Sequence, residues 1–185
     1  LGLCEFNGSK DNNIIWTGFG KHNFTPFKDL NPNASSDERY KAVAGGPLMA
    51  LASPDGIHWT KLRDEPIITR GSFDSQNLAF WGTEQSQYVA YIRDFRDDIR
   101  QIKRCTSPDF NHWTEPEWLE YGDTPLEHFY TNAVTPYFRA SQLYLGFPKR
   151  FMPHRHAVKE QPEPGVSDAV FMSSRDGLHW DRRFM

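Results

Sequence analysis

The sequence predicts an all-β fold, a β-propeller fragment of about three four-stranded blades. The first observation is a pattern of Ser, Asp and a closing His-Trp that occurs three times, at 53–59, 107–113 and 174–180. The copies are roughly 50 to 70 residues apart, which is room for four strands and their loops, the size of a blade. The second observation is that each copy follows an apolar, strand-like run, whereas no segment shows a helical period.

Composition limits the function classes. The 185 residues include 15% aromatic residues, enough for one globular domain with a core. The net charge of −3 comes from scattered charges, which disfavours nucleic acid and anionic membrane surfaces as partners. No apolar run has transmembrane length. Cys4 and Cys105 fit neither a disulfide framework nor a zinc site, so we expect no metal and no cofactor.

The first units are expected in this order. Residues 1–20 finish a preceding blade, with a strand at 12–17. Because Leu1 is not an initiator methionine and the chain starts within a unit, we expect a fragment or a processed form. The sequence shows no signal-peptide pattern. Residues 21–70 form the first full blade, with strands at 23–29 and 39–44 before the first Ser/Asp turn.

The next two units follow the same plan. Residues 71–123 form a blade that opens at 73–81 and returns at 87–93, a run rich in aromatic and β-branched residues. Residues 124–185 form the last blade, which is interrupted by an inserted Pro-rich loop at 149–166 and continues with a strand at 166–173 before the third turn. Long loops inside compact repeats are often functional. The loop carries His154, Arg155 and His156, for which solvation is the expected state rather than metal binding.

The repeated pattern predicts a hairpin turn. Its Ser and Asp side chains are expected to bond to nearby backbone amides, and a Gly often supplies a positive φ. The tryptophans that close the three copies are expected to anchor the blade cores rather than to stack on sugars. Losing one of them should cost about 3–5 kcal/mol. These residues are Trp59, Trp113 and Trp180.

Three acids are placed alike in the successive units. Asp29, Asp74 and Glu127 lie on or at the start of the expected first strands, which line the central channel of a propeller. Converging carboxylates raise at least one pKa, so that one acid stays protonated beside an ionised base. Glycoside hydrolysis needs such a pair. Each of these acids also has a structural reading as a cap or a turn residue.

An arrangement of Asp, Asp and Glu on successive blades resembles the five-bladed β-propeller glycosidases, which include arabinanases and β-xylosidases as well as invertases and levansucrases. The segments 73–77, 91–93 and 127–132 also resemble uncharacterised bacterial proteins placed near these enzymes. The resemblance implies five blades, hydrolysis of a polysaccharide or oligosaccharide, and an extracellular or periplasmic location. It would make Asp29 the general base and Glu127 the general acid, with Asp74 holding substrate and tuning the acid.

The chain departs from the invertase branch. That branch has an Asn-Asp-Pro-Asn nucleophile motif, whereas this chain has Asp29-Leu-Asn-Pro-Asn33 in a different order. We therefore expect inversion, with Asp29 and Glu127 on either side of a water and the sugar. On this hypothesis Asp29→Asn and Glu127→Gln abolish hydrolysis and leave the melting curve nearly unchanged. The turns also resemble the Asp boxes of sialidases, which are structural.

Seven further residues are candidates for sugar binding through hydrogen bonds or ring stacking. A non-catalytic propeller that binds glycan or protein is the alternative reading. The placement of the acids distinguishes a hydrolase from a binding domain, because a catalytic pair converges across one cavity whereas a binding module can scatter its acids. Arg93 also has the simpler reading of pairing with a nearby acid. The candidates are His22, Asn77, Trp81, Arg93, Tyr130, Asn132 and Arg150.

Overall fold

The computed structural model describes residues 1–183 and is all-β, apart from one 3-10 turn at Ser36–Glu38. Its first four strands form an antiparallel sheet in sequential order, which we call sheet 1. Sheet 2 has the same order and follows directly. The strands of sheet 1 are β1 (Thr25–Lys28), β2 (Tyr40–Gly45), β3 (Leu48–Ser53) and β4 (Thr60–Lys61), and those of sheet 2 are β5 (Leu78–Gly82), β6 (Gln87–Arg96), β7 (Ile99–Ser107) and β8 (Glu117–Trp118).

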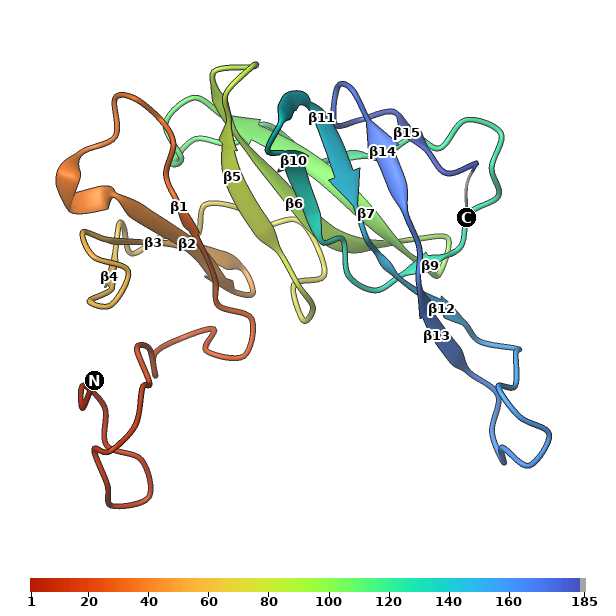
Figure 1. The fold of residues 1–185 in the computed structure, drawn as a ribbon, viewed down its shortest axis with the longest axis horizontal. Coiled ribbons are helices and arrows are strands. Elements are labelled where there is room, and N and C mark those ends of the chain that lie inside the picture. The colour runs from red at the N-terminus through yellow and green to blue at the C-terminus, as the bar shows by residue number, and fades with distance from the viewer. Residues whose placement is uncertain (184–185) are drawn as a thin grey trace.

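Sheet 3 is also four-stranded and antiparallel, but a three-stranded small sheet is formed within the same stretch of chain. The small sheet has the order β13-β12-β9, and its strands β12 and β13 project from the body as a ribbon (Figure 1). Sheet 3 contains β10 (Val134–Tyr137), β11 (Ala140–Gly146), β14 (Met172–Ser174) and β15 (Trp180–Asp181), and the small sheet contains β9 (His128–Phe129), β12 (Lys149–Met152) and β13 (Val166–Ala169).

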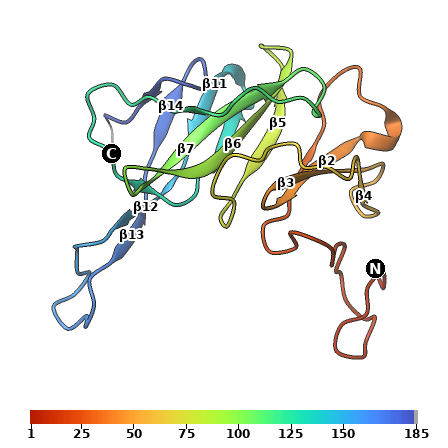
Figure 2. The same ribbon diagram turned by 180° about the vertical axis from the view of Figure 1, so that it is seen from behind.

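The sheets follow one another across the molecule in a propeller-like succession, which is also visible from behind (Figure 2). A sheet that packs on both faces must be apolar on both faces, so its strands have continuous rather than alternating hydrophobic runs. The middle strands β2 and β3 show this, because all but Tyr40 of their residues are buried. Within residues 1–183, no helix is long and apolar enough to cross a membrane.

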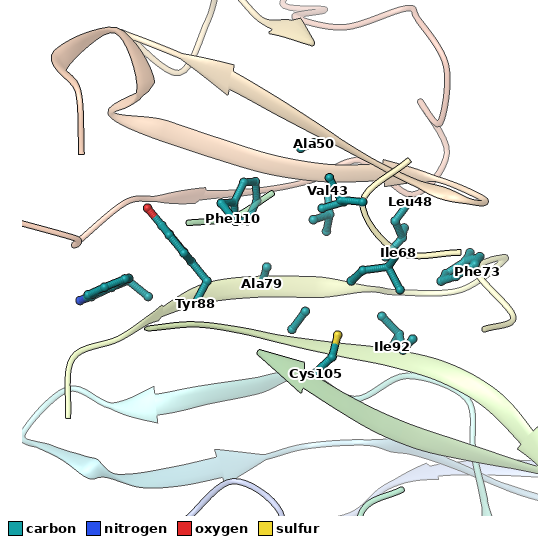
Figure 3. Close-up of a cluster of buried hydrophobic side chains, with 13 residues drawn as sticks. Val43, Leu48, Ala50, Ile68, Phe73, Ala79, Tyr88, Ile92, Cys105 and Phe110 are labelled. Atoms are coloured by element: carbon teal, nitrogen blue, oxygen red, sulfur yellow. The ribbon is translucent and has the colours of Figure 1, made fainter. Parts of the chain in front are cut away.

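Two apolar layers join the sheets. Between sheets 1 and 2, Val43 and Leu48 face Tyr88 and Ile92, and Phe110 packs in the same layer (Figure 3). Between sheets 2 and 3, the layer contains Tyr91, Val134, Tyr144 and Trp180, among others. Because each layer is made of side chains from two sheets, packing fixes the position of each sheet against the next.

The three Ser/Asp turns connect the third and fourth strands of their sheets and have matching hydrogen bonds. In the second turn, Oδ1 of Asp109 accepts from the amides of Asn111 at 2.9 Å and His112 at 2.8 Å. The indole of Trp113 donates to the carbonyl of Phe110 at 3.0 Å. Phe110 has φ +67° where the other two turns have Gly at φ +78°, so the turn requires a left-handed residue at this place.

The tryptophans of these turns contribute to the cores to different degrees. Trp59 and Trp180 are buried, whereas Trp113 is half-buried and packs edge-on against Phe110. Trp180 makes an edge contact with Tyr91 in sheet 2, with ring centroids 6.1 Å apart. The turn of one sheet thereby supplies an anchor for the layer between two sheets.

The turn carboxylates are expected to make stability depend on acid pH. Partial burial would raise the pKa of Asp109, but hydrogen bonds from His112 and Asn111 outweigh it and hold the pKa well below its usual range. A depressed folded-state pKa gives stability that is complete above the unfolded value of about 3.9 and is lost below it. We expect Asp109→Asn to cost about 1 kcal/mol at neutral pH.

Urea unfolding at several pH values tests this expectation. The difference between wild type and Asp109→Asn should narrow as the pH falls below about 4, because the carboxyl of the unfolded chain becomes protonated there while that of the folded chain is still ionised. Asp64→Asn is the matched control, because the Asp64 side chain is 94% exposed and lies 4.0 Å from Lys61. A difference that stays constant over this pH range would contradict the assignment.

Three local expectations differ from the structure. Residues 12–17 form no strand, because no neighbouring strand within the described chain offers them a ladder; Trp16 packs on Phe24 instead. The expected loop 149–166 begins with strand β12 and ends in strand β13, which pair with each other. The expected strand 166–173 is divided between β13 and β14, which belong to different sheets.

Candidate functional site

Asparagines occupy the equivalent place at the beginning of each sheet. Asn77 directly precedes β5, while Asn23 and Asn132 stand two residues before β1 and β10. Asn23 donates to the carbonyls of Gly45 at 2.9 Å and Phe73 at 2.7 Å, and it accepts from the amide of Gly45. This asparagine therefore ties sheet 1 to the segment that enters sheet 2.

The other two asparagines act in the same way. Asn77 donates to the carbonyls of Phe73 and Ser75, and Asn132 donates to those of Gln76 and Tyr91. Asn77 is fully buried and Asn132 is 1% exposed. Because their amides are used by the backbone and are closed to solvent, this geometry gives no support to their predicted role in sugar binding.

Asp74 and Arg93 form an ion pair at the place where the chain enters sheet 2. Asp74 lies in the segment between sheets 1 and 2, and its side chain is 71% exposed. Arg93 in β6 has a side chain only 3% exposed and donates Nη2 to Asp74. Its Nε and Nη1 are buried and have no hydrogen-bond partner within the described residues. The pair thus presents an accessible carboxylate supported by a buried cation.

A cavity of about 490 Å³ opens beside Asp74. Its wall contains His22 from the segment before β1 and Pro47 from the turn between β2 and β3, and Phe73 adds an apolar surface. His22 is exposed. A polar group on an apolar floor is typical of a ligand cavity, and the structure brings together the sequence-predicted residues His22, Asp74 and Arg93.

Besides its ion pair with Asp74, Arg93 belongs to a row of cations and aromatic rings. Its Cζ lies 4.9 Å from the ring centroid of Phe95 and 5.5 Å from that of Tyr130. Arg100 Cζ lies 5.3 Å from the Phe95 ring, and Lys149 Nζ lies 5.4 Å from the Tyr130 ring. Tyr130 is held in place at its backbone, where its carbonyl accepts from Ser75. Tyr130, a candidate from the sequence, therefore lies beside the Asp74–Arg93 pair.

Asp29 lies elsewhere. It follows the last residue of β1 rather than starting a strand, and its side chain is fully buried. Lys41 Nζ donates to it at 2.6 Å and the hydroxyl of Tyr88 donates at 2.7 Å. Burial would lower the pKa of Lys41, but the hydrogen bond and charge of Asp29 outweigh this and raise it. As placed, Asp29 holds sheets 1 and 2 together and has no face open to a sugar.

Glu127 is tied to arginines. It precedes β9 in the small sheet, not the first strand of sheet 3 as expected. Arg150 donates to it at 2.9 Å, and the buried Arg182 donates to its other oxygen. Arg150 also makes two hydrogen bonds to Asp168, at 2.9 and 2.7 Å. Arg150, a predicted sugar ligand, is thus occupied with two carboxylates.

Glu127 and Asp74 are not brought into one cavity. Glu127 lines a cavity of about 590 Å³ with His128 and His154, whereas Asp74 lines the one beside His22. In β12, Lys149 contacts Tyr130 while its neighbour Arg150 contacts Glu127. Successive residues of a strand project to opposite faces, so Glu127 and Tyr130 lie on opposite faces of the small sheet. The three predicted acids therefore have three different surroundings.

Two further observations concern Trp81 and the arrangement of possible metal ligands. Trp81 is 8% exposed and packs edge-on against Tyr88 at 4.9 Å between ring centroids, so it belongs to the core rather than to a sugar platform. Among residues 1–183, no group of three His, Cys, Asp or Glu side chains is arranged to hold a metal ion.

Sequence reasoning missed Arg100 and Lys149. Arg100 lies near the start of β7 and Lys149 starts β12, which the sequence analysis placed within a loop. The Lys-Arg dipeptide at 149–150 was a signal for Lys149. Neighbouring residues of a strand project to opposite faces, so only one of the two can face the site. No comparable signal distinguished Arg100.

No protein-family model matches the sequence, and no curated protein matches it. Solved structures with a similar fold include a glycosyl hydrolase from Bacteroides ovatus, with a TM-score of 0.51 and 12% identity over 86% of this chain and 47% of that chain. A candidate glycoside hydrolase from Parabacteroides distasonis has a TM-score of 0.51 and 14% identity, covering 86% and 48%. A third, described as a glycoside hydrolase, has a TM-score of 0.50 and 11% identity, covering 88% and 55%.

These similarities concern the fold. The chain spans about half the length of each of these three structures. At such low identity the shared feature is the arrangement of sheets, since function depends on the residues of a site rather than on a fold. The all-β arrangement is therefore one that glycoside hydrolase-like proteins also have.

Proposed function

We propose that this chain is a glycan-acting domain of the glycoside hydrolase type, built on the plan of a five-bladed propeller. Two observations support the proposal. The antiparallel sheets succeed one another as blades do, and the fold is similar to that of glycoside hydrolase-like proteins. In such folds the first strands of successive sheets start at one edge of the molecule, where the segments that enter the sheets meet. This edge is a suitable place for a ligand.

The arrangement of Asp74 and Arg93 carries the proposal. An exposed carboxylate accepts hydrogen bonds from sugar hydroxyls, and a neighbouring imidazole can donate or accept them. Asp74 offers the first group and His22 the second, and both line the same cavity. Arg93 holds the carboxylate of Asp74 in place, because the Arg93 side chain is itself immobilised by burial. Tyr130 adds an aromatic surface beside the pair.

The catalytic roles divide as follows. Asp74 is the most exposed of the three predicted acids, with 71% of its side chain open to solvent, and a buried guanidinium supports it, so we assign it the contact with the sugar. Glu127 keeps the predicted role of general acid, which both retaining and inverting hydrolysis require, and inversion remains the predicted outcome. Asp29 is assigned to the packing of sheets 1 and 2, because Lys41 and Tyr88 enclose it.

The experiment is a screen of wild type for glycan binding and for release of reducing sugar from plant and microbial polysaccharides. We expect Asp74→Asn and Glu127→Gln each to reduce hydrolysis by about 10²–10⁴-fold, the usual contribution of an acid or base. Proton NMR of the first product gives its anomeric configuration. Asp64→Asn is the control, because Asp64 is an exposed acid near Lys61, away from the cavity.

Each result has a defined reading. Full activity of Glu127→Gln would remove the general acid from the proposal, and a retained configuration would remove inversion. Undiminished hydrolysis and binding in Asp74→Asn would contradict the site itself.

A non-catalytic glycan-binding domain is the second candidate. The separate surroundings of Asp29, Asp74 and Glu127 favour it, because a hydrolase needs two carboxyl groups across one sugar. In this case wild type binds a glycan without cleaving it, and Asp74→Asn weakens that binding. Wild type that neither binds nor cleaves any glycan would contradict both candidates.

A further inference from the structure

The cavity next to Tyr130 has an excess of positive charge. It has a volume of about 250 Å³ and is lined by Arg100, Tyr130, Lys149, Phe151 and Ser167. No carboxylate among residues 1–183 lies within ion-pair distance of Arg100 or Lys149. Nε of Arg100 is also buried without a hydrogen-bond partner. The cavity therefore has two cations that the described chain does not neutralise.

Arg93 adds a third cation behind the same rings. Arg93 and Arg100 both contact the ring of Phe95, and Arg93 and Lys149 both contact that of Tyr130. Three cations thus alternate with two rings, and only Arg93 has an acidic partner, Asp74. Arg93 is buried, Arg100 is half-buried and Lys149 is exposed. Like charges gathered around a buried guanidinium are unfavourable unless an anion balances them.

Two neighbouring groups respond to this charge. Burial, followed by the charge of Arg100, lowers the pKa of Arg93. Burial, followed by the charges of Arg100 and His154, lowers the pKa of His128. In both cases burial is the main cause, and the positive charge of Arg100 acts in the same direction.

We propose that the Arg100–Lys149 cavity is a subsite for the carboxylate of an acidic sugar, placed next to the Asp74–Arg93 site. This inference rests on the proposed function and adds the substrate class to it. Guanidinium and ammonium groups bind carboxylates by charge-assisted hydrogen bonds, and the Tyr130 ring provides a surface for the sugar face. The cavity is at the small end for ligand sites, so it fits a single sugar residue.

The test compares binding of glucuronate and galacturonate with that of glucose and galactose, by titration calorimetry at low ionic strength. Inorganic phosphate is a further probe. We expect the acidic sugars to bind about tenfold or more tightly than the neutral ones, the gain from one charge-assisted hydrogen bond. Added salt should weaken binding of the acidic sugars and leave that of the neutral sugars unchanged.

Two variants locate the subsite. Arg100→Gln and Lys149→Gln should each remove most of the preference for acidic sugars while binding of the neutral sugars persists. Arg139→Gln is the control for the first, because Arg139 is exposed and its Cζ lies 5.1 Å from the ring of Phe138. Lys28→Gln is the control for the second, because Lys28 is an exposed strand lysine in sheet 1.

The outcomes separate this inference from the proposed function. Equal binding of acidic and neutral sugars by wild type would overturn the subsite and leave glycan binding in place. A preference that survives in both variants would overturn its location. Phosphate that binds as tightly as the acidic sugars would overturn the assignment to a sugar-borne carboxylate. Absence of binding by every sugar would count against both the subsite and the proposed function.

Discussion

Asp29→Asn is expected to lower the free energy of unfolding by about 3–5 kcal/mol, because it leaves the ammonium of Lys41 buried without a counter-charge. The two side chains are fully buried and 3% exposed, respectively, and their charged atoms are 2.6 Å apart. Asp29 also accepts a hydrogen bond from Tyr88 in sheet 2. Sequence reasoning predicted a nearly unchanged melting curve for this variant, so urea unfolding decides between a structural and a catalytic Asp29.

A second variant distinguishes the lost charge from general disruption. In Asp29→Asn/Lys41→Met the unpaired ammonium is replaced by an apolar chain of similar length, and we expect most of the lost stability to return. Asp64→Asn serves as the exposed control and should stay within about 0.5 kcal/mol of wild type. An Asp29→Asn variant as stable as this control would contradict the buried ion pair.

Trp180→Ala is expected to cost about 3–5 kcal/mol, the usual range for truncation of a large core side chain. Trp180 is 4% exposed, lies in the layer between sheets 2 and 3, and its indole donates to the carbonyl of Gly177. Removing it leaves a cavity beside Tyr91 and Met172, and the carbonyl of Gly177 keeps only its hydrogen bond from the hydroxyl of Tyr91. Thermal and urea unfolding measure the effect.

Trp16→Ala provides the comparison for Trp180→Ala. Trp16 is half-buried in the irregular N-terminal segment and stacks on Phe24 with ring centroids 6.0 Å apart. Its truncation should cost clearly less than that of Trp180, since less of its surface is removed from water. Equal losses in the two variants would contradict the role of Trp180 as an anchor between sheets.

The all-β class was predictable because it depends on local signals. The Ser/Asp turns use hydrogen bonds between residues two or three positions apart, so their sequence pattern is sufficient to predict them. The apolar run Leu48–Ser53 likewise indicates a strand buried on both faces. The division of 166–173 between two sheets was not predictable, because β13 pairs with β12 and β14 pairs with β11, and both partners are distant in the chain.

The candidate site was predictable only in part. Asp74 was identified from its place at an expected strand start. The other candidates, His22, Arg93 and Tyr130, were identified from their capacity for hydrogen bonding or ring stacking, and the structure brings these residues together. Asn77 was expected to bind sugar, but its amide bonds to the backbone. A buried amide and a sugar-binding amide look the same in a sequence, because burial depends on what packs over the residue.

The sequence by itself determined the repeated turns, the strand-rich composition and the set of polar residues from which a site can be built. Tertiary structure alone decided which of these residues share a surface. Asp29 and Lys41 are paired inside the molecule because sheet 2 closes over them, and Glu127 faces away from Tyr130 because strand pairing sets the face of each residue. The physical reason is that local hydrogen bonds are determined by neighbouring residues, whereas burial and charge pairing depend on segments that are distant in the chain.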